Sequence, residues 1–469
     1  MRNRVFMITT GLSLLTVALT PVAASAGVVV TTSCSFDAPT ATVTAVVGSG
    51  DSATLDRSGT AITFGGAPCG AADVTNTDRI NISTPDTTTS ETITISEAGG
   101  TLAPGKTAET DGSDEIEIAV DLTFEDVLAF VGTSGSDSIA VTSTGADLIP
   151  GSPFENEVTY PSFYPHVVGS VILDGGQGDD ALFIRSYKAT VDGGPGDDAI
   201  VGTDGYGSTY AGDAGADSVA IRDNYGSAIE VRAAAAGDYS VDNTGQTDTL
   251  TGTESVEGDA GSDTFIGSAG PDHFIGDAGN DRFIPLGGDD IVEGGDGFDR
   301  LSLSDAVDPV TVDLTDQTAV GDGAESFPGV EVLDGTPQAD RFTGDPRTSG
   351  VIFVDGDGGR DVLDLRSATH RQFVWTTPDE TNAPPTWARL EVRSIRRIQG
   401  SDRSDRIEVG DVDGNELRAR FSGNGGDDLL VGGIHHDVLR GGPGDDTLDG
   451  KARRDVCYGG AGVNTYINC

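Results

Sequence analysis

The sequence predicts an all-β protein, a parallel β-roll or β-helix with an N-terminal β-domain. A nine-residue unit is written twice in GDAGSDTFIGSAGPDHFI, from Gly258 to Ile275. Segments before residue 165, such as ETITISEAGG and DEIEIAV, alternate apolar and polar residues as short strands do. Glycine is abundant at 67 residues while aromatic residues make up only 6%. These features favour a stacked array over a single large core.

The nine-residue unit recurs in strict phase in two blocks. Five units follow Gly258 without a gap and five more follow Gly423. Further good copies begin at Gly175, Gly193, Gly212 and Gly356. Fixed-period repetition of this kind indicates a quasi-linear architecture built from stacked coils.

Each position of the unit has a chemical reason. The first six residues are expected to form a tight turn, in which glycine permits positive φ and lets carbonyl groups crowd inward. Aspartate at position six adds a carboxylate, and the last three residues form a strand with an apolar middle residue. Two units would complete one coil, so turns 18 residues apart would stack about 4.8 Å from each other. Such carbonyl and carboxylate oxygens suit Ca²⁺, whereas Mg²⁺ demands stricter geometry.

The unit resembles the hemolysin-type calcium-binding repeat of the RTX family, GGxGxDxUx, in patches from Gly175 to Ile467. The segment Val310–Gly344 is similar to the spacers between such blocks. The resemblance implies a parallel β-roll that binds several Ca²⁺ ions and folds when they bind. The chain lacks the long apolar region of the cytolytic members, so the resemblance does not imply a toxin.

Predicted calcium ligands are the turn glycines, through their carbonyl groups, and the aspartates at position six. They are Gly175, Gly178, Asp180, Gly193, Gly196, Asp198, Gly212, Gly215, Asp217, Gly258, Gly261, Asp263, Asp272, Gly276, Gly279, Asp281, Asp290, Gly294, Gly297, Asp299, Asp361, Gly423, Gly426, Asp428, Gly441, Gly444 and Asp446. Asp78, Asp114 and Asp137 also fall at the aspartate position, but their turns lack most of the glycines. We interpret these three as decayed structural turns.

The C-terminal block is predicted to be asymmetric. Turns at Gly423, Gly441 and Gly459 share one edge and keep their glycines, with Asn464 replacing the last aspartate. On the other edge, GGIHHD and GKARRD carry His435 and Arg453 at position four. We therefore expect no calcium between Gly432 and Gly450, with the basic side chains pairing with Asp437 and Asp455. Transition-metal binding by His435 and His436 is the alternative.

Charge and the N-terminus indicate an exported protein. The formal net charge is -48, which repels nucleic acid and anionic membranes and attracts cations. Residues 1–26 have the features of a signal peptide, with Arg2 and Arg4 before an apolar run and a small-residue site ending at Ala26. A retained membrane anchor is the alternative. No later stretch is apolar for the 18 or more residues of a membrane helix.

Four cysteines remain after the signal peptide: Cys34, Cys69, Cys457 and Cys469. An even number in a secreted chain suggests disulfides, for which three pairings exist. The local pairs Cys34–Cys69 and Cys457–Cys469 require the least folding over distance. Free thiols or a zinc site are the alternative, although the close spacing of a zinc motif is absent.

The predicted organisation has five parts. Residues 1–26 form the signal peptide and 27–165 an N-terminal β-domain that could be the first coils of one β-helix. Residues 166–302 form a first repeat block, 303–420 a β spacer with one repeat-like turn, and 421–469 a second block ending in a disulfide.

Recognisable reaction machinery is absent from the sequence. Neither HExxH nor GxSxG occurs. The predicted function is a calcium-binding structural or adhesive role rather than catalysis. The alternative is a β-helix lyase or epimerase acting on an acidic polysaccharide. Clustered arginines at 389, 393, 396, 397, 403 and 406 either balance nearby carboxylates or bind such a polyanion.

Overall fold

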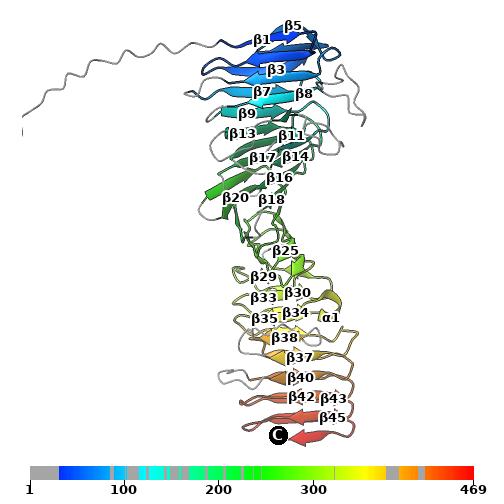
Figure 1. Ribbon diagram of the computed structural model, residues 1–469. Coiled ribbons are helices and arrows are strands. Elements are labelled where there is room, and N and C mark those ends of the chain that lie inside the picture. The colour runs from blue at the N-terminus through cyan, green and yellow to red at the C-terminus, as the bar shows by residue number, and fades with distance from the viewer. Residues whose placement is uncertain are drawn as a thin grey trace, which may run out of the picture.

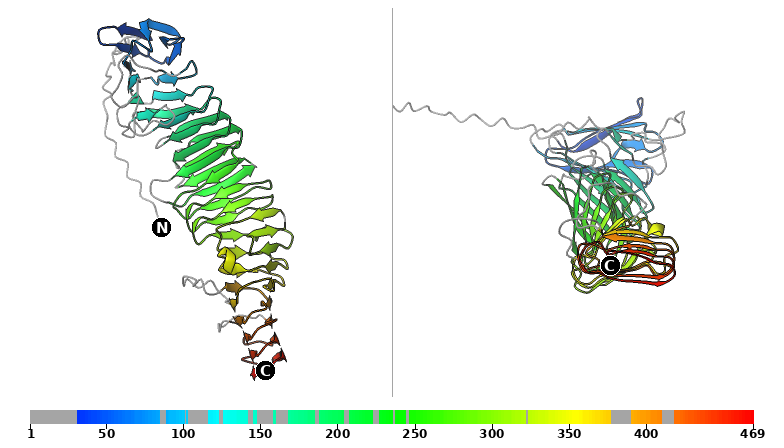
Figure 2. Two further views of the ribbon diagram at one scale, coloured as in Figure 1. Left: turned by 90° about the vertical axis from the view of Figure 1, so that its right-hand side faces the viewer. Right: turned by 90° about the horizontal axis from the view of Figure 1, so that it is seen from below.

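The computed structural model describes residues 31–84, 89–100, 102, 116–122, 126–141, 145–147, 158–159, 168–184, 188–203, 207–222, 227–235, 237–243, 246–321, 323–376, 390–409 and 418–469. The signal peptide predicted at residues 1–26, Asp114 and Arg389 lie outside the described residues. The described chain forms one elongated stack of strands from the N-terminal end to the C-terminal end (Figure 1, Figure 2). The all-β prediction is confirmed, and the helix found among these residues is the short α1 (Pro346–Ser349).

Two long sheets face each other along the stack, with 22 strands in each. The first sheet, in pairing order, contains β1 (Ser33–Asp37), β2 (Thr42–Val46), β6 (Arg79–Ser83), β8 (Glu117–Asp121), β12 (Val158–Thr159), β11 (Gly145–Asp147), β10 (Ser138–Val141), β14 (Ala181–Ile184), β16 (Ala199–Thr203), β18 (Ser218–Arg222), β22 (Ser255–Glu257), β24 (His273–Ile275), β27 (Ile291–Glu293), β32 (Ala324–Ser326), β31 (Thr318–Val320), β30 (Thr311–Asp313), β34 (Arg341–Thr343), β36 (Val362–Asp364), β39 (Arg397–Gln399), β41 (Arg420–Ser422), β43 (Val438–Pro443) and β45 (Val456–Ala461).

The second sheet follows the other side of each coil. In pairing order it contains β5 (Ala67–Asp73), β4 (Ala61–Phe64), β3 (Ser52–Ser58), β7 (Thr92–Ser96), β9 (Asp126–Val131), β13 (Val168–Asp174), β15 (Ala189–Pro195), β17 (Thr209–Ala214), β21 (Gln246–Thr251), β20 (Asp238–Asn243), β19 (Glu230–Ala235), β23 (Thr264–Ile266), β26 (Arg282–Ile284), β29 (Arg300–Ser302), β33 (Val332–Asp334), β35 (Phe353–Asp355), β38 (Leu390–Arg393), β37 (Phe373–Thr376), β40 (Arg406–Val409), β42 (Leu429–Val431), β44 (Thr447–Asp449) and β46 (Thr465–Ile467). A small separate pair consists of β25 (Ala278–Gly279) and β28 (Asp296–Gly297).

The repeat blocks have the predicted 18-residue coil. Thr264 pairs with Arg282 in the second sheet, and His273 pairs with Ile291 in the first, both in parallel. Consecutive nine-residue units therefore contribute strands to opposite sheets. Parallel pairing also crosses residue 165, because β9 pairs with β13.

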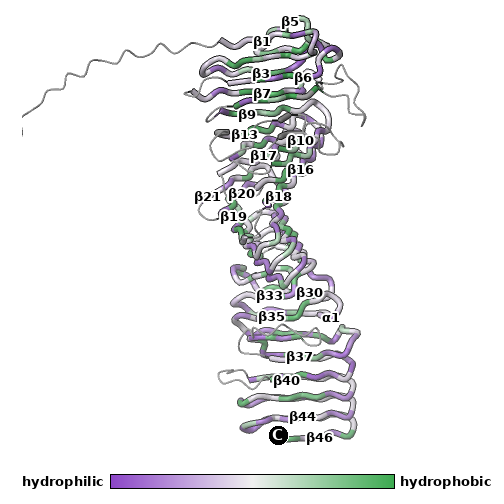
Figure 3. The backbone as a smooth tube through the Cα atoms, viewed as in Figure 1, coloured by the Kyte–Doolittle hydropathy of each residue, from purple (hydrophilic) through white to green (hydrophobic). Residues whose placement is uncertain are grey.

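The apolar residue at position eight of each unit fills the space between the sheets. Phe265, Phe274, Phe283, Val292 and Leu301 are fully buried. Hydrophilic residues gather at the edges of the C-terminal coils, where the turns lie (Figure 3). The thin core depends on one inward side chain per strand, as expected for three-residue strands that alternate between faces.

Among the described residues, three antiparallel meanders lie between coils, β10–β12, β19–β21 and β30–β32, and a fourth, β3–β5, lies at the N-terminal end of the stack. In each of the first three, the last strand pairs with the preceding coil and the first strand pairs with the following coil, as β27 with β32 and β30 with β34. The sequence does not predict these meanders, because their strands carry no nine-residue signature.

Both predicted local disulfides are present. Cys34–Cys69 joins β1 to β5 at the N-terminal end of the stack, and Cys457–Cys469 closes the final coil.

Candidate metal centre

The repeat turns form two rows, one along each edge of the stack. Turns beginning at Gly258, Gly276 and Gly294 connect the first sheet to the second, and turns beginning at Gly267 and Pro285 return to the first. Turns 18 residues apart therefore lie above one another, as predicted from the repeat.

Within each row the aspartates form a hydrogen-bonded ladder. The backbone N–H of Asp263 donates to Oδ1 of Asp281 at 2.8 Å, and the N–H of Asp281 donates to Oδ1 of Asp299 at 2.8 Å. The same bond joins Asp180 to Asp198, Asp198 to Asp217, and Asp428 to Asp446. One carboxylate oxygen of each aspartate is thus committed to the preceding coil.

The second oxygen, Oδ2, lies against the glycine at position one of its own turn. A Cβ added to Gly276 would come within 3.0 Å of both Asp281 Oδ2 and the carbonyl oxygen of Gly294, one coil later. Gly276 has no left-handed φ, so the lack of space for a Cβ demands glycine there, in keeping with the crowding expected from the sequence. In the same turn the left-handed backbone occurs at positions two and four, where Asp277 has φ of 73° and Gly279 has φ of 149°.

Ten of these Oδ2 atoms are buried without a hydrogen-bond partner among the described residues. Nine belong to Asp180, Asp198, Asp217, Asp281, Asp290, Asp299, Asp361, Asp428 and Asp446, all at most 2% exposed, and the tenth belongs to the partly buried Asp455. A buried carboxylate oxygen without a partner is costly, so such atoms call for a ligand. The first nine are in the predicted calcium set, whereas Asp455 was expected to pair with a basic side chain.

Burial also changes the acid–base properties of these aspartates. Burial, followed by the repulsion of neighbouring carboxylates, raises the pKa of Asp281 to about 7 and the pKa of Asp428 to about 8. The same causes raise the pKa of Asp180 and of Asp290 to about 6. A bound cation would favour the ionised form and reverse these shifts.

The donor set fits calcium. Oδ2 of one turn and the carbonyl oxygen of the next coil face the same point, and both are the hard oxygen ligands that Ca²⁺ prefers. Within the described ranges, no group of three or more His, Cys, Asp or Glu side chains converges to hold a metal. Backbone carbonyl groups would therefore have to complete the coordination.

Two predicted ligands have a different environment. Oδ2 of Asp272 accepts a hydrogen bond from the N–H of Ser268 at 2.6 Å, and Oδ2 of Asp263 accepts one from Asp259 at 3.1 Å. Asp137, which we interpreted as part of a decayed turn, is capped in the same way by Thr133.

In the C-terminal block the predicted difference between the rows holds for only one of the two turns. Oδ2 of Asp428 and Asp446 has no partner, and Oδ2 of Asp437 accepts the N–H of Gly433 at 2.7 Å. Oδ2 of Asp455, in the same row as Asp437, is however also buried without a partner among the described residues. The predicted ion pairs of Lys451, Arg453 or Arg454 with Asp437 and Asp455 are absent from this fully described segment. Asn464 ends its row, accepting the N–H of Asp446 through Oδ1.

Some ladder residues are not among the ligands predicted from the sequence. Asp340 and Asp405 occupy the same turn position, and each follows a glycine by five residues, which was the available signal. Glu254 and Glu331 accept the N–H groups of Asp217 and Asp299 where no repeat follows. No sequence signal identifies these two glutamates.

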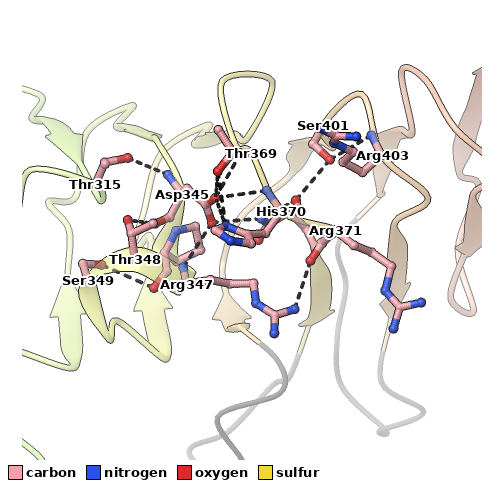
Figure 4. A network of polar contacts seen from close by, with 12 residues as sticks. Thr315, Asp345, Arg347, Thr348, Ser349, Thr369, His370, Arg371, Ser401 and Arg403 are labelled. Carbon is pink, nitrogen blue, oxygen red and sulfur yellow. Dashed lines mark hydrogen bonds and ion pairs between the residues drawn. The ribbon is translucent and has the colours of Figure 1, made fainter.

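Asp345 is a buried aspartate whose two carboxylate oxygens both accept hydrogen bonds (Figure 4). It caps α1 and accepts hydrogen bonds from Arg347, Thr369, His370 and Gln372. Although burial opposes the effect, the bonds from His370 and Gln372 lower the pKa of Asp345. We therefore regard Asp345 as a structural carboxylate.

The arginines of the spacer lie among carboxylates. Arg393 is 3.4 Å from Asp355 and Arg406 is 2.6 Å from Glu408. A cavity of about 750 Å³ beside them is lined by Arg347, Arg371 and Arg406, but also by acidic residues that include Asp427 and Asp445. This mixed lining does not single out a polyanion.

The comparisons with known proteins agree with the geometry. The family described as the RTX calcium-binding nonapeptide repeat (four copies) matches residues 257–292, 284–308, 413–448, 422–456 and 431–466. No curated protein matches the chain. Within the described residues, no helix is long and apolar enough to cross a membrane.

Proposed function

Because the chain carries RTX calcium-binding nonapeptide repeats, we propose that it is a secreted protein whose β-roll folds upon binding calcium and serves a structural or adhesive role. The observation that carries the proposal is the set of ten buried Oδ2 atoms without a partner among the described residues. The aspartates that would hold the ions are Asp180, Asp198, Asp217, Asp281, Asp290, Asp299, Asp361, Asp428, Asp446 and Asp455. When bound, calcium supplies the positive charge that these carboxylates lack.

Electrostatics explains why folding would depend on the ion. Two carboxylates about 5 Å apart repel by about 3 kcal/mol at an effective dielectric constant near 20. Several such pairs occur in each row, and the glycine-rich turns lose much conformational entropy on ordering. These costs are comparable to the whole stability of a typical domain, so binding free energy becomes folding free energy.

Export agrees with the remaining features of the chain. The N-terminal segment has signal-peptide character, the net charge is -48, and the two disulfides suit an oxidising compartment. Millimolar calcium outside the cell would then trigger folding after export. We propose a non-enzymatic role, because the distinctive carboxylates lie in repeated turns rather than in one catalytic constellation.

Circular dichroism of the full mature chain tests the proposal. In excess EGTA we expect the β signal of the repeat blocks to be lost, and in millimolar calcium we expect it to return. Magnesium at the same concentration serves as the control and should restore much less. An unchanged β spectrum in EGTA, together with no measurable calcium binding, would contradict the proposal.

A further inference from the structure

The turns fall into two backbone classes that differ at their second residue. In the turns of all ten aspartates without an Oδ2 partner, this residue has a left-handed φ, between 55° and 124°. The second residues are Gly176, Gly194, Asp213, Asp277, Leu286, Gly295, Asp357, Asn424, Gly442 and Lys451. We call these the open turns.

In the closed turns, the N–H of the second residue donates to Oδ2 of the aspartate four residues later. The donor–acceptor distances are 2.5–3.1 Å. The described chain contains six such turns, joining Thr133 to Asp137, Asp259 to Asp263, Ser268 to Asp272, Thr336 to Asp340, Ser401 to Asp405 and Gly433 to Asp437. None of these second residues has a left-handed φ.

The side chain of the second residue explains the closed conformation. In five of the six closed turns it is Ser, Thr or Asp, and its oxygen accepts the N–H of position four. Examples are Ser268 with Gly270 at 3.0 Å and Ser401 with Arg403 at 3.1 Å. The other three bonds join Thr133 to Gly135, Asp259 to Gly261 and Thr336 to Gln338. Such local turns hold the backbone away from the left-handed region, which glycine and asparagine enter readily.

This difference bears directly on cation binding. In a closed turn, a backbone N–H points at Oδ2 with its partial positive charge, at the place a cation would need. In an open turn the left-handed residue turns its N–H away, so Oδ2 stays available beside the carbonyl oxygen of the next coil, as at Gly276 and Gly294. Opening a closed turn would require breaking the hydrogen bond to Oδ2 and, in the five turns with Ser, Thr or Asp at the second position, the side-chain bond as well.

The closed turns also have a characteristic place in the ladders. Each lies at the N-terminal head of a row, as Asp263 precedes Asp281 and Asp405 precedes Asp428. In four of the six closed turns, Oδ1 of the aspartate accepts a hydrogen bond from the backbone N–H of an inserted segment instead of a repeat turn. The donors are Ile229, Val310, Gln372 and Ala419.

We propose that only the open turns bind calcium, and that the six closed turns hold their coils together without an ion. The assignment presupposes that the roll binds calcium. It removes Asp263 and Asp272 from the predicted ligands, although their turns match the repeat consensus well. It retains Asp290, although Pro285 replaces the first glycine of that turn. It adds Asp455, whose turn opens at Lys451, against the expectation of no calcium between Gly432 and Gly450.

Counting bound calcium in matched variants tests the assignment. Asp281→Asn and Asp263→Asn replace a carboxylate by an amide at two positions of the same row, 18 residues apart. The amide of asparagine places a hydrogen-bond donor where Oδ2 lies, as at Asn464, whose Nδ2 donates to Gly460. Full mature protein is equilibrated in calcium, its fold is checked by circular dichroism, and ions per chain are measured by equilibrium dialysis.

We expect Asp281→Asn to lose at least one ion per chain and Asp263→Asn to keep the native number. Equal losses in both variants, or no loss in either while the native chain binds calcium, would overturn the assignment. A native chain that binds no calcium would instead refute the proposed function. The pairs Asp290→Asn with Asp272→Asn and Asp428→Asn with Asp405→Asn repeat the test where one variant fails to fold.

Discussion

The rings of Phe265 and Phe283 lie stacked, with centroids 5.0 Å apart and planes at 11°, although 18 residues separate them. The pairing register that aligns their strands also aligns Asp263 with Asp281 at the edge. The same repeat therefore determines both the core packing and the ligand row. A substitution in the core should for this reason also affect the ligand row, and the reverse.

Replacing Phe283 by alanine should destabilise the first repeat block by about 3–5 kcal/mol, because it leaves a cavity between fully buried rings. Thermal unfolding in saturating calcium measures the loss. Phe298→Ala is the control, since its side chain is 39% exposed and should cost little. Equal unfolding temperatures in the two variants would contradict the prediction.

Replacing Gly276 by alanine should weaken calcium binding and stability together. The new Cβ would collide with Oδ2 of Asp281 and with the carbonyl oxygen of Gly294, which are both expected ligand atoms. Calcium titration followed by intrinsic fluorescence or calorimetry measures the shift. Gly425→Ala is the matched control within a turn, since its Cβ would meet nothing closer than 3.5 Å. Equal calcium affinity in both variants would count against the close contact.

Replacing Tyr239 by phenylalanine should cost about 1–3 kcal/mol, because its hydroxyl donates a 2.8 Å hydrogen bond to buried Oδ1 of Asp272. Urea denaturation in calcium measures this cost. The number of bound ions should stay the same, because the turn of Asp272 is closed. Tyr458→Phe, at a ring 55% exposed, serves as the control. A loss of ions in Tyr239→Phe would show that this turn takes part in binding.

Removing the C-terminal disulfide with Cys457→Ser and Cys469→Ser should cost about 3 kcal/mol, since it closes a loop with a sequence separation of 12. The effect should be local, with faster hydrogen exchange in β45 and β46 than in β23 and β26. The Cys34–Cys69 disulfide remains in this variant as an internal reference. Unchanged hydrogen-exchange rates in β45 and β46 would show that the disulfide does not stabilise the last coil.

Much of the architecture was predictable, because the repeat determines it residue by residue. The spacing of Asp263 and Asp281 gave the coil length, and the alternation of units gave the two rows. The two local disulfides followed from chain distance alone. The meanders were not predictable, since their pairing depends on contacts with coils that lie far away in sequence.

The candidate site was predicted in outline only. The consensus identified the aspartates but could not distinguish Asp272 from Asp290, whose difference depends on the φ of Ser268 and Leu286. Serine at the second position is a readable signal for a closed turn. Aspartate is not, because Asp259 closes its turn whereas Asp277 opens its own. The arginines at 453 and 454 were expected to pair with carboxylates by charge alone, but within the described residues 418–469 they form no such ion pair.

The ladder of Asp amides and Oδ1 atoms has a consequence for how ions would enter the roll. The Oδ1 atom of each aspartate accepts the backbone N–H of the aspartate one coil earlier. An ion that orders one carboxylate therefore also orders the turn of the preceding coil, and the next ion binds to a site that is already partly ordered. Uptake should therefore be positively cooperative between neighbouring coils, as in a one-dimensional lattice with nearest-neighbour coupling. Each row begins at its own closed turn, so cooperativity should stop there and the two repeat blocks should titrate as separate steps.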